Sequence, residues 1–328
     1  MAERVLVTGV TGYIGQYCAA ELLSKGYDVV GTVRSLSKAN ATRAAIAAVA
    51  PVENLTFVKA DLLSDDGWDD AMQGCSYVLH VASPFFLAEP KDENELIAPA
   101  VDGTRRVIDA AERAGVRRMV LTSSVAAMIT GKPSGRYGPD AWSDTSADIG
   151  AYPKSKTLAE RAAWEAVAES DMELAVINPG VVFGPSLGAE IDGQSVALIT
   201  DMIGGKMPMV PDIAMGAVDV RDVAKLHVAA MTTTDAAGKR FIAATAEPVS
   251  MRDVAAVLRD AGYTKAPKRK APRVAIKMMS LFDREAKGLL PMIGKRAAFD
   301  NQATFDILGW QPTPMDASLT EMAASIAR

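Results

Sequence analysis

Six short apolar segments alternate with helical segments over the first 180 residues, and this alternation limits the possible folds more than any other feature. Each segment is a near-continuous apolar run, as expected for strands that are covered by helices on both faces of a sheet. Strands are predicted at Arg4–Thr8, Tyr27–Val33, Leu55–Ala60, Tyr77–Ala82, Arg117–Ser124 and Leu174–Gly180. The pattern predicts an α/β fold with a Rossmann-type, doubly wound parallel sheet.

The regular pattern weakens after Gly180, where residues 184–216 are rich in glycine, proline and methionine. Ala217–Met231 restores a strand followed by a helix, and Arg240–Thr245 predicts one more strand. We therefore expect two interleaved parts. The Rossmann domain should comprise residues 1–180 and about 217–245, and a smaller, mainly helical C-terminal substrate lobe should comprise residues 181–216 and 246–328.

Composition is typical of a soluble globular protein. The chain has 328 residues, a net charge of −5 and a pI of about 5.3, so nucleic acid is not an expected partner. Two cysteines provide no disulfide framework, and no apolar run approaches the ~18 residues of a membrane span. A cytoplasmic location without a membrane partner is predicted. The basic segment Lys265–Arg273 could meet an acidic partner, but a solvated loop is the favoured interpretation.

A glycine-rich segment follows the first predicted strand and opens the first helix. Its glycines have the spacing G-x-x-G-x-x-G in "VTGVTGYIG". Glycines permit a tight turn there and let backbone N–H groups approach a pyrophosphate at the positive end of a helix. The predicted dinucleotide-binding residues in this turn are Gly9, Thr11, Gly12, Tyr13, Ile14 and Gly15.

The residues after the second and third strands predict the cofactor. An acidic residue after the second strand would bind a ribose 2′-hydroxyl and favour NAD, but Arg34 and Ser35 stand there instead. Because an arginine suits a 2′-phosphate and Lys38 lies close by in sequence, NADP is the predicted cofactor. Asp61 and Leu62, after the third strand, are expected to flank the adenine.

The segment "AYPKSKTLAER" places Tyr152 and Lys156 four residues apart at the start of a predicted helix, Lys154–Ser170. Residues at this spacing share one face of a helix, and Pro153 is tolerated in its first turn. The spacing permits a chemical role, but it occurs often by chance and does not establish one.

Several motifs in order resemble one family. They are "VTGVTGYIG", "GTVRS", "KADL", "VLHVASPF", "VLTSS", "YPKSKTLAERAAW", "NPGVVFGP" and "VDVRDVA". The chain resembles the extended short-chain dehydrogenase/reductases. Within them it is similar to the branch of dihydroflavonol reductases, cinnamoyl-CoA reductases and microbial aldehyde and ketone reductases.

This resemblance implies a catalytic set of Ser124, Tyr152 and Lys156, with Ser123 as the adjacent alternative to Ser124. Tyr152 would be the general acid, Lys156 would lower its pKa and bind the nicotinamide ribose, and Ser124 would donate to the carbonyl oxygen. The resemblance places further cofactor contacts at Val81, Ala82, Ser83, Thr122, Pro179, Gly180 and Val182.

Apolar residues in loops at the carboxyl edge of the sheet predict the substrate pocket. The proposed contacts are Phe85, Phe86, Met128, Leu187 and Met207, with Leu87, Tyr137, Ile203 and Met209 also near the pocket wall. Such a wall suits an apolar or aromatic aldehyde or ketone. The tyrosine segment "DIGAYPKSK" lacks the longer asparagine-tryptophan-tyrosine-cysteine-tyrosine run of the plant CoA-ester reductases, which argues against a CoA thioester.

The leading prediction is therefore an NADPH-dependent carbonyl reductase, which would act in reverse as an alcohol dehydrogenase. A hydroxysteroid-type dehydrogenase, a nucleotide-sugar epimerase or dehydratase, and a non-enzymatic NADP sensor are alternatives, because fold alone does not separate them. No metal site is expected, since His80 and His227 are the only histidines and His80 reads as a packed strand residue. A monomer and a homodimer both remain open.

Overall fold

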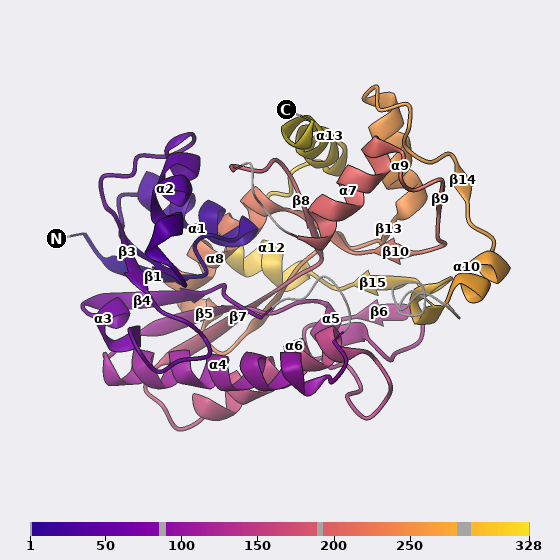
Figure 1. The fold of residues 1–328 in the computed structure, drawn as a ribbon. Helices are drawn as coiled ribbons and strands as arrows, with labels where there is room; N and C mark the ends of the chain where they lie inside the picture. Colours follow the sequence, from indigo (N-terminus) through magenta and orange to yellow (C-terminus); the bar gives the residue numbers. More distant parts are fainter. Residues whose placement is uncertain (1, 85–89, 189–192, 281–289, 328) are drawn as a thin grey trace.

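A computed structural model describes residues 2–84, 90–188, 193–280 and 290–327. Seven strands form one parallel sheet in the order β3-β2-β1-β4-β5-β7-β12 (Figure 1). The strands are β1 (Arg4–Thr8), β2 (Asp28–Val33), β3 (Leu55–Lys59), β4 (Cys75–His80), β5 (Arg118–Thr122), β7 (Glu173–Pro179) and β12 (Arg240–Ala243). The predicted Rossmann-type fold is confirmed.

Helices cover both faces of this sheet. On one face pack α1 (Tyr13–Ser24), α2 (Ala39–Ala47), α8 (Val220–Thr232) and α12 (Gln302–Leu308), and on the other α3 (Trp68–Met72), α4 (Asn94–Arg113) and α6 (Ala151–Ala166). Figure 1 shows α4 and α6 side by side below the sheet. Within β1, Val5 and Val7 enter one core while Leu6 enters the other, which explains why the centre of the strand is continuously apolar.

Besides the two cores on the faces of the sheet, the C-terminal half of the chain builds a separate core beside the sheet domain. This separate core is named the second core. It contains Phe183, Ile199, Met202, Val254, Leu258, Leu319 and Met322, among others. Its helices are α7 (Gln194–Gly204), α9 (Met251–Asp260), α10 (Arg273–Met279) and α13 (Met315–Ile326). Leu308 and Trp310, within the predicted lobe, pack instead against the core of the sheet domain.

Short strands and turns connect these parts. Paired short strands are β6 (Gly135–Tyr137) with β15 (Ala297–Phe299), β8 (Val181–Phe183) with β11 (Ala217–Asp219), β9 (Met209–Val210) with β14 (Arg269–Lys270), and β10 (Ala214–Met215) with β13 (Val249–Ser250). The remaining elements are α5 (Ala126–Ile129) and the 3-10 turns Leu36–Lys38, Thr234–Ala236 and Leu290–Met292. No helix in the described ranges is long and apolar enough to cross a membrane.

Two boundaries differ from the prediction in ways that affect the site. Helix α6 begins at Ala151 rather than Lys154, so that Tyr152 lies in its first turn with Pro153. Strand β5 ends at Thr122 rather than Ser124. Both serines therefore lie in the turn beyond the strand, where adjacent side chains need not alternate as they do in a strand.

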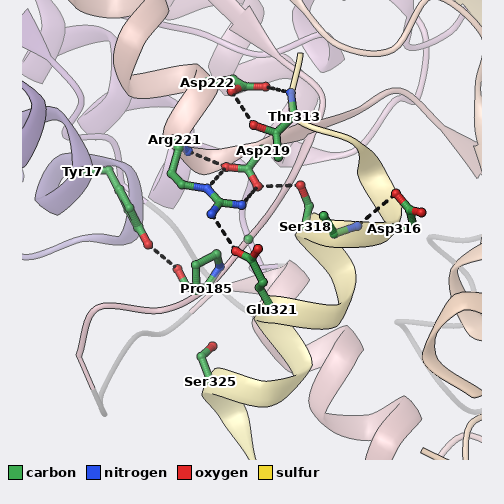
Figure 2. A network of polar contacts seen from close by, with 12 residues as sticks. Tyr17, Pro185, Asp219, Arg221, Asp222, Thr313, Asp316, Ser318, Glu321 and Ser325 are labelled. Carbon is green, nitrogen blue, oxygen red and sulfur yellow. Dashed lines mark hydrogen bonds and ion pairs between the residues drawn. The ribbon is translucent and has the colours of Figure 1, made fainter. Parts of the chain in front are cut away.

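A network of polar contacts fixes α13 to the start of α8 (Figure 2). Asp219 accepts hydrogen bonds from the Arg221 guanidinium at 2.8 and 2.7 Å and from the Ser318 hydroxyl. Arg221 also bonds Glu321 of α13 at 2.6 Å, and Asp222 accepts from the N–H and hydroxyl of Thr313. The last helix of the chain is thus held to the sheet domain by charged hydrogen bonds.

Asp219→Asn is expected to destabilise the fold by about 2 kcal/mol at neutral pH, because it weakens bonds that involve a charged group. Burial alone would raise the pKa of Asp219, but its hydrogen bonds with Arg221 and Ser318 bring that pKa below the ordinary 3.8. The carboxylate therefore stabilises the fold above about pH 4, and this contribution is lost as pH falls through the lowered pKa.

Urea unfolding at pH 7 and at pH 3 tests this prediction. The difference between wild type and Asp219→Asn should be smaller at the lower pH, where more of the carboxylate is protonated. The exposed Asp171 provides a control, since Asp171→Asn should leave the free energy of unfolding nearly unchanged. An equal difference at both pH values would contradict the role given to the Asp219 charge.

Candidate functional site

The turn between β1 and α1 forms a backbone cradle. Gly9 has a φ of +65°, and the Gly12 N–H donates to its carbonyl at 2.9 Å. A Cβ placed on Gly15 would lie 2.3 Å from the Gly9 carbonyl oxygen, so a larger residue would displace the turn. Gly12 caps α1 without a side-chain hydrogen bond, and the first turn carries no acidic residue. The positive helix end and its N–H groups suit a dinucleotide pyrophosphate.

The other residues predicted for this turn have further contacts. Gln16 donates to the Thr11 carbonyl at 3.1 Å, and the Tyr13 hydroxyl donates to the Gly184 carbonyl at 2.5 Å. Ile14 is partly buried and packs against the core beneath α1. The Tyr13 side chain therefore attaches the loop after β8 to the start of α1.

The segment after β4 lies directly against the glycine turn. The Thr8 hydroxyl bonds His80 Nδ1 at 2.8 Å and accepts from the Ala82 N–H at 2.9 Å. A Cβ on Gly9 would lie 2.9 Å from the Ala82 Cα atom. Ala82 thereby lies against the glycine turn, with Val81 and Ser83 on either side of it in the chain, and their cofactor role stays a prediction. Burial, and then the charge of Lys156, lower the pKa of His80 to about 3, so that this histidine is a neutral packing residue.

The predicted ribose and adenine contacts meet at the ends of β2 and β3. The Ala60 N–H donates to the Val33 carbonyl at 3.1 Å, which holds the segment that leads to Asp61 against the end of β2, directly before Arg34. Arg34, Ser35 and Lys38 are exposed. The Asp61 carboxylate accepts from the Leu63 N–H at 3.0 Å, and Leu62 packs beside Gly103 of α4.

Tyr152 and Lys156 lie one turn apart on α6. Burial raises the pKa of Tyr152, and a side-chain hydrogen bond with Ser124 opposes that rise. Lys156 Nζ donates to the Thr122 carbonyl at 3.3 Å. Burial lowers the pKa of Lys156 to about 8, and the negative charge of Glu160 acts against this decrease. At neutral pH Tyr152 is therefore a protonated phenol, and the Lys156 ammonium beside it is mostly charged.

The structure distinguishes the two candidate serines. The Ser123 hydroxyl donates to Glu160 Oε2 at 2.5 Å, in a fully buried position. The Ser124 hydroxyl accepts from the Ala126 N–H at 3.1 Å and is hydrogen-bonded to Tyr152. Ser124 is thus the serine that lies with the tyrosine, and Ser123 is directed into the protein.

The segment after β7 closes this part of the site. The Pro179 carbonyl accepts from the Val125 N–H at 2.9 Å, just beyond Ser124. A Cβ on Gly180 would lie 2.3 Å from the Gly216 carbonyl oxygen, so only glycine permits this approach. Val182, in β8, is partly exposed. The Thr122 hydroxyl bonds His227 at 2.6 Å, so its contribution toward the site is the carbonyl that accepts from Lys156.

The predicted substrate contacts have different environments. Met128 is fully buried with Ile242, Ala244 and Phe299, so its side chain belongs to a core and is not available to a substrate. Leu187 and Met207 are partly buried. Phe85, Phe86 and Leu87 lie outside the described residues. Of the other residues near the predicted wall, Tyr137 donates to the Pro133 carbonyl, Ile203 packs in the second core and Met209 is 36% exposed.

Two charged residues of the site were missed by the sequence analysis. Glu160 and Arg240 form an ion pair with Nε and Oε1 2.5 Å apart, and their side chains are 0% and 8% exposed. The signal for Glu160 was its position four residues after Lys156, which places it on the same face of the helix. Nothing in the strand pattern around Arg240 indicated its partner.

Among the described residues, no three histidine, cysteine, aspartate or glutamate side chains lie together as a metal site would require. The only two cysteines, Cys18 and Cys75, are buried thiols.

Comparison with known proteins agrees with this fold. Residues 5–244 match the model of the NAD dependent epimerase/dehydratase family. Cinnamoyl-CoA reductase CAD2 of Medicago truncatula is 37% identical over 253 residues, which are 74% of this chain and 76% of that protein. The crystal structure of yeast methylglyoxal/isovaleraldehyde reductase Gre2 with NADPH has a TM-score of 0.79 and 26% identity, and covers 98% of both chains. Gre2 of Candida albicans with NADPH has a TM-score of 0.82 and 27% identity, covering 99% of this chain and 98% of that one.

The chain therefore belongs to the NAD-dependent epimerase/dehydratase family, the extended short-chain dehydrogenase/reductases. Within this family it lies in the branch of the cinnamoyl-CoA, dihydroflavonol and Gre2-type reductases, as the motifs predicted. The predicted class, an oxidoreductase, is confirmed with it.

Gly15→Ala is expected to weaken NADPH binding at least about tenfold, because the added methyl group would meet the Gly9 carbonyl and displace the cradle. Fluorescence titration with NADPH measures the effect. Gly204→Ala is a matched control, since a Cβ there meets nothing within 4 Å. Equal affinity in both variants would show that the turn does not hold the cofactor.

Proposed function

We propose that this protein is an NADPH-dependent carbonyl reductase that transfers hydride to an apolar or aromatic aldehyde or ketone, and that acts in reverse as an alcohol dehydrogenase. One observation carries the proposal. Ser124, Tyr152 and Lys156 come together at the carboxyl edge of the sheet, next to the Thr122 carbonyl and the segment after β7. This is the edge at which ligands bind in open α/β sheets.

NADPH supplies a hydride when it is bound. Reduction of a carbonyl builds negative charge on its oxygen, and two groups of the chain would meet that charge. Ser124 would donate a hydrogen bond to the oxygen, and Tyr152 would deliver the proton. The raised pKa of Tyr152 keeps its proton in place before the reaction. The nearby Lys156 ammonium then favours the tyrosinate that the transfer leaves behind.

The expected preference for NADP(H) agrees with the relatives, two of which are NADPH complexes. In this chain the preference is assigned to Arg34, assisted by Lys38 and Ser35, because these exposed groups stand at the end of β2 with no acidic side chain in that place. Asp61 and Leu62 would flank the adenine. Val81–Ser83 and Pro179–Val182 would line the nicotinamide end.

The proposed substrate class rests on the apolar residues around this edge. Leu187 and Met207 remain partly accessible and would contact the substrate, together with Phe85 and Phe86. Because Met128 is enclosed in a core, it is not retained as a contact. The methylglyoxal and isovaleraldehyde reductase among the solved relatives supports a small carbonyl compound rather than a sugar nucleotide. We further propose that the second core forms the substrate lobe.

The test is NADPH oxidation, with NADH in parallel, against aromatic and aliphatic aldehydes, ketones and diketones. Tyr152→Phe should lower kcat by about 10²–10⁴-fold, because the variant lacks the proton donor. Its affinity for NADPH should remain close to that of wild type. A near-normal rate in this variant would refute the assignment of Tyr152 as the acid. Failure of wild type on every carbonyl would refute the proposed activity.

Arg34→Ala should weaken NADPH binding by about tenfold to a hundredfold, because it removes charged hydrogen bonds to the 2′-phosphate. NADH lacks this phosphate, so its affinity should change little. Isothermal titration with both nucleotides measures the ratio. Arg252→Ala, an exposed position on α9, is the control. Equal losses for NADPH and NADH would contradict a specific role in phosphate recognition.

A further inference from the structure

A single buried carboxylate joins four elements behind the catalytic residues. Glu160 of α6 is 1% exposed and accepts hydrogen bonds from Ser123 at 2.5 Å and from Asn178 Nδ2 at 3.0 Å. Arg240 of β12 donates to both of its oxygens, at 2.5 and 3.2 Å. The carboxylate therefore connects α6 with β12, with the end of β7 and with the turn after β5.

Arg240 is in turn fixed on its other sides. It donates to the carbonyls of Pro139 and Ala141, and its guanidinium carbon lies 3.9 Å from the centroid of the Trp142 ring. Removing two charges from water is costly, so a buried ion pair adds little net stability compared with apolar residues of similar size. Its geometry, by contrast, is strongly restricted, because every donor and acceptor must meet its partner.

The same carboxylate connects the two segments that carry the proposed catalytic residues. The first segment is α6, where Glu160 follows Lys156 by one turn. The second is the turn after β5, whose Ser123 bonds Glu160 directly. Asn178 adds a second connection, since its Nδ2 also donates to the Ser124 carbonyl at 3.3 Å. The backbone on both sides of the Ser124 side chain is thereby attached to the helix that carries Tyr152.

We propose that Glu160, held by Arg240, is a positioning residue that fixes Ser124 relative to Tyr152. This inference rests on the proposed function, because it assigns Glu160 a role in the same reaction. Glu160 makes no contact with the reacting oxygen; it acts through Ser123 and Asn178. Errors of about 1 Å in the placement of a catalytic group can lower a rate by about 10²-fold, so the attachment has a measurable consequence.

A double-mutant cycle between Glu160→Gln and Ser124→Ala tests the inference. Glutamine keeps the size of the side chain but lacks the charge that holds Arg240. Glu160→Gln alone should lower kcat about tenfold or more with the affinity for NADPH nearly unchanged. In the Ser124→Ala background the same change should have an effect of less than about twofold, because the group that it positions is already absent.

A matched control lies on the same helix. Glu165 also belongs to α6 and pairs with Arg105 at 3.4 Å, but its side chain is 70% exposed. Glu165→Gln should leave kcat, KM and the thermal unfolding temperature nearly unchanged. A loss of rate in this control would show that any change of charge on α6 disturbs the reaction, which would overturn the specific role of Glu160.

A second variant weakens the attachment without leaving a buried charge unpaired, since only the connection through Asn178 then remains. Ser123→Ala deletes one hydrogen bond and keeps the Glu160–Arg240 pair intact. If Glu160→Gln does not fold, as judged by thermal unfolding and NADPH binding, the cycle is carried out with Ser123→Ala. The proposal would be overturned if the loss of kcat in the positioning variant were equally large with and without Ser124→Ala. It would also be overturned if the positioning variant alone left kcat unchanged.

These results are distinguishable from failure of the proposed function. Wild-type turnover and the Ser124→Ala variant test whether a carbonyl is reduced and whether this serine takes part. The coupling between the two sites tests Glu160. An active enzyme whose rate depends on Ser124 but shows no coupling would reject only the positioning role.

Discussion

Parallel pairing of β1 between β2 and β4 is the constraint on which the site depends. Because all seven strands run in one direction, the turns after β1, β2, β3, β4, β5 and β7 emerge at the same edge. The strand order changes direction at β1, where the connections from β2 and β4 lead to opposite sides. The glycine turn opens at this point, and the Thr8–Ala82 hydrogen bond attaches the turn after β4 to it. The predicted cofactor-binding and catalytic residues can therefore meet although more than 140 residues separate Gly9 from Tyr152.

The fold was predictable because its physical causes are local in the sequence. A strand that is covered on both faces needs apolar residues on both, and Val5–Val7, Met119–Leu121 and Leu174–Ile177 show this directly. The glycine turn was also predictable, because the steric need for glycine at Gly9 and Gly15 leaves a visible spacing. The family relationship and the oxidoreductase class were predictable for the same reason, since the motifs that define them stand at these turns. Comparison with known proteins confirms both.

The parts that could not be predicted depend on contacts between distant segments. Ser123 and Ser124 are chemically identical, and only the backbone of the turn after Thr122 decides which of them faces Tyr152. Met128 follows the strand as a pocket residue would, yet it packs against Ile242 and Phe299, from the C-terminal half of the chain. The pairing of β6 with β15 and the attachment of α13 through Asp219 likewise have no local pattern.

Burial has opposing consequences for the two ionisable groups of the proposed reaction. It raises the pKa of Tyr152 and lowers that of Lys156, so it favours the neutral form of each. A neutral tyrosine is the form that can donate a proton, whereas a neutral lysine would not stabilise the tyrosinate. Because the pKa of Lys156 remains near 8, this lysine is nevertheless mostly charged at neutral pH. The Glu160 carboxylate behind it is paired with Arg240, which allows a negative charge to be buried behind a reaction that itself develops negative charge.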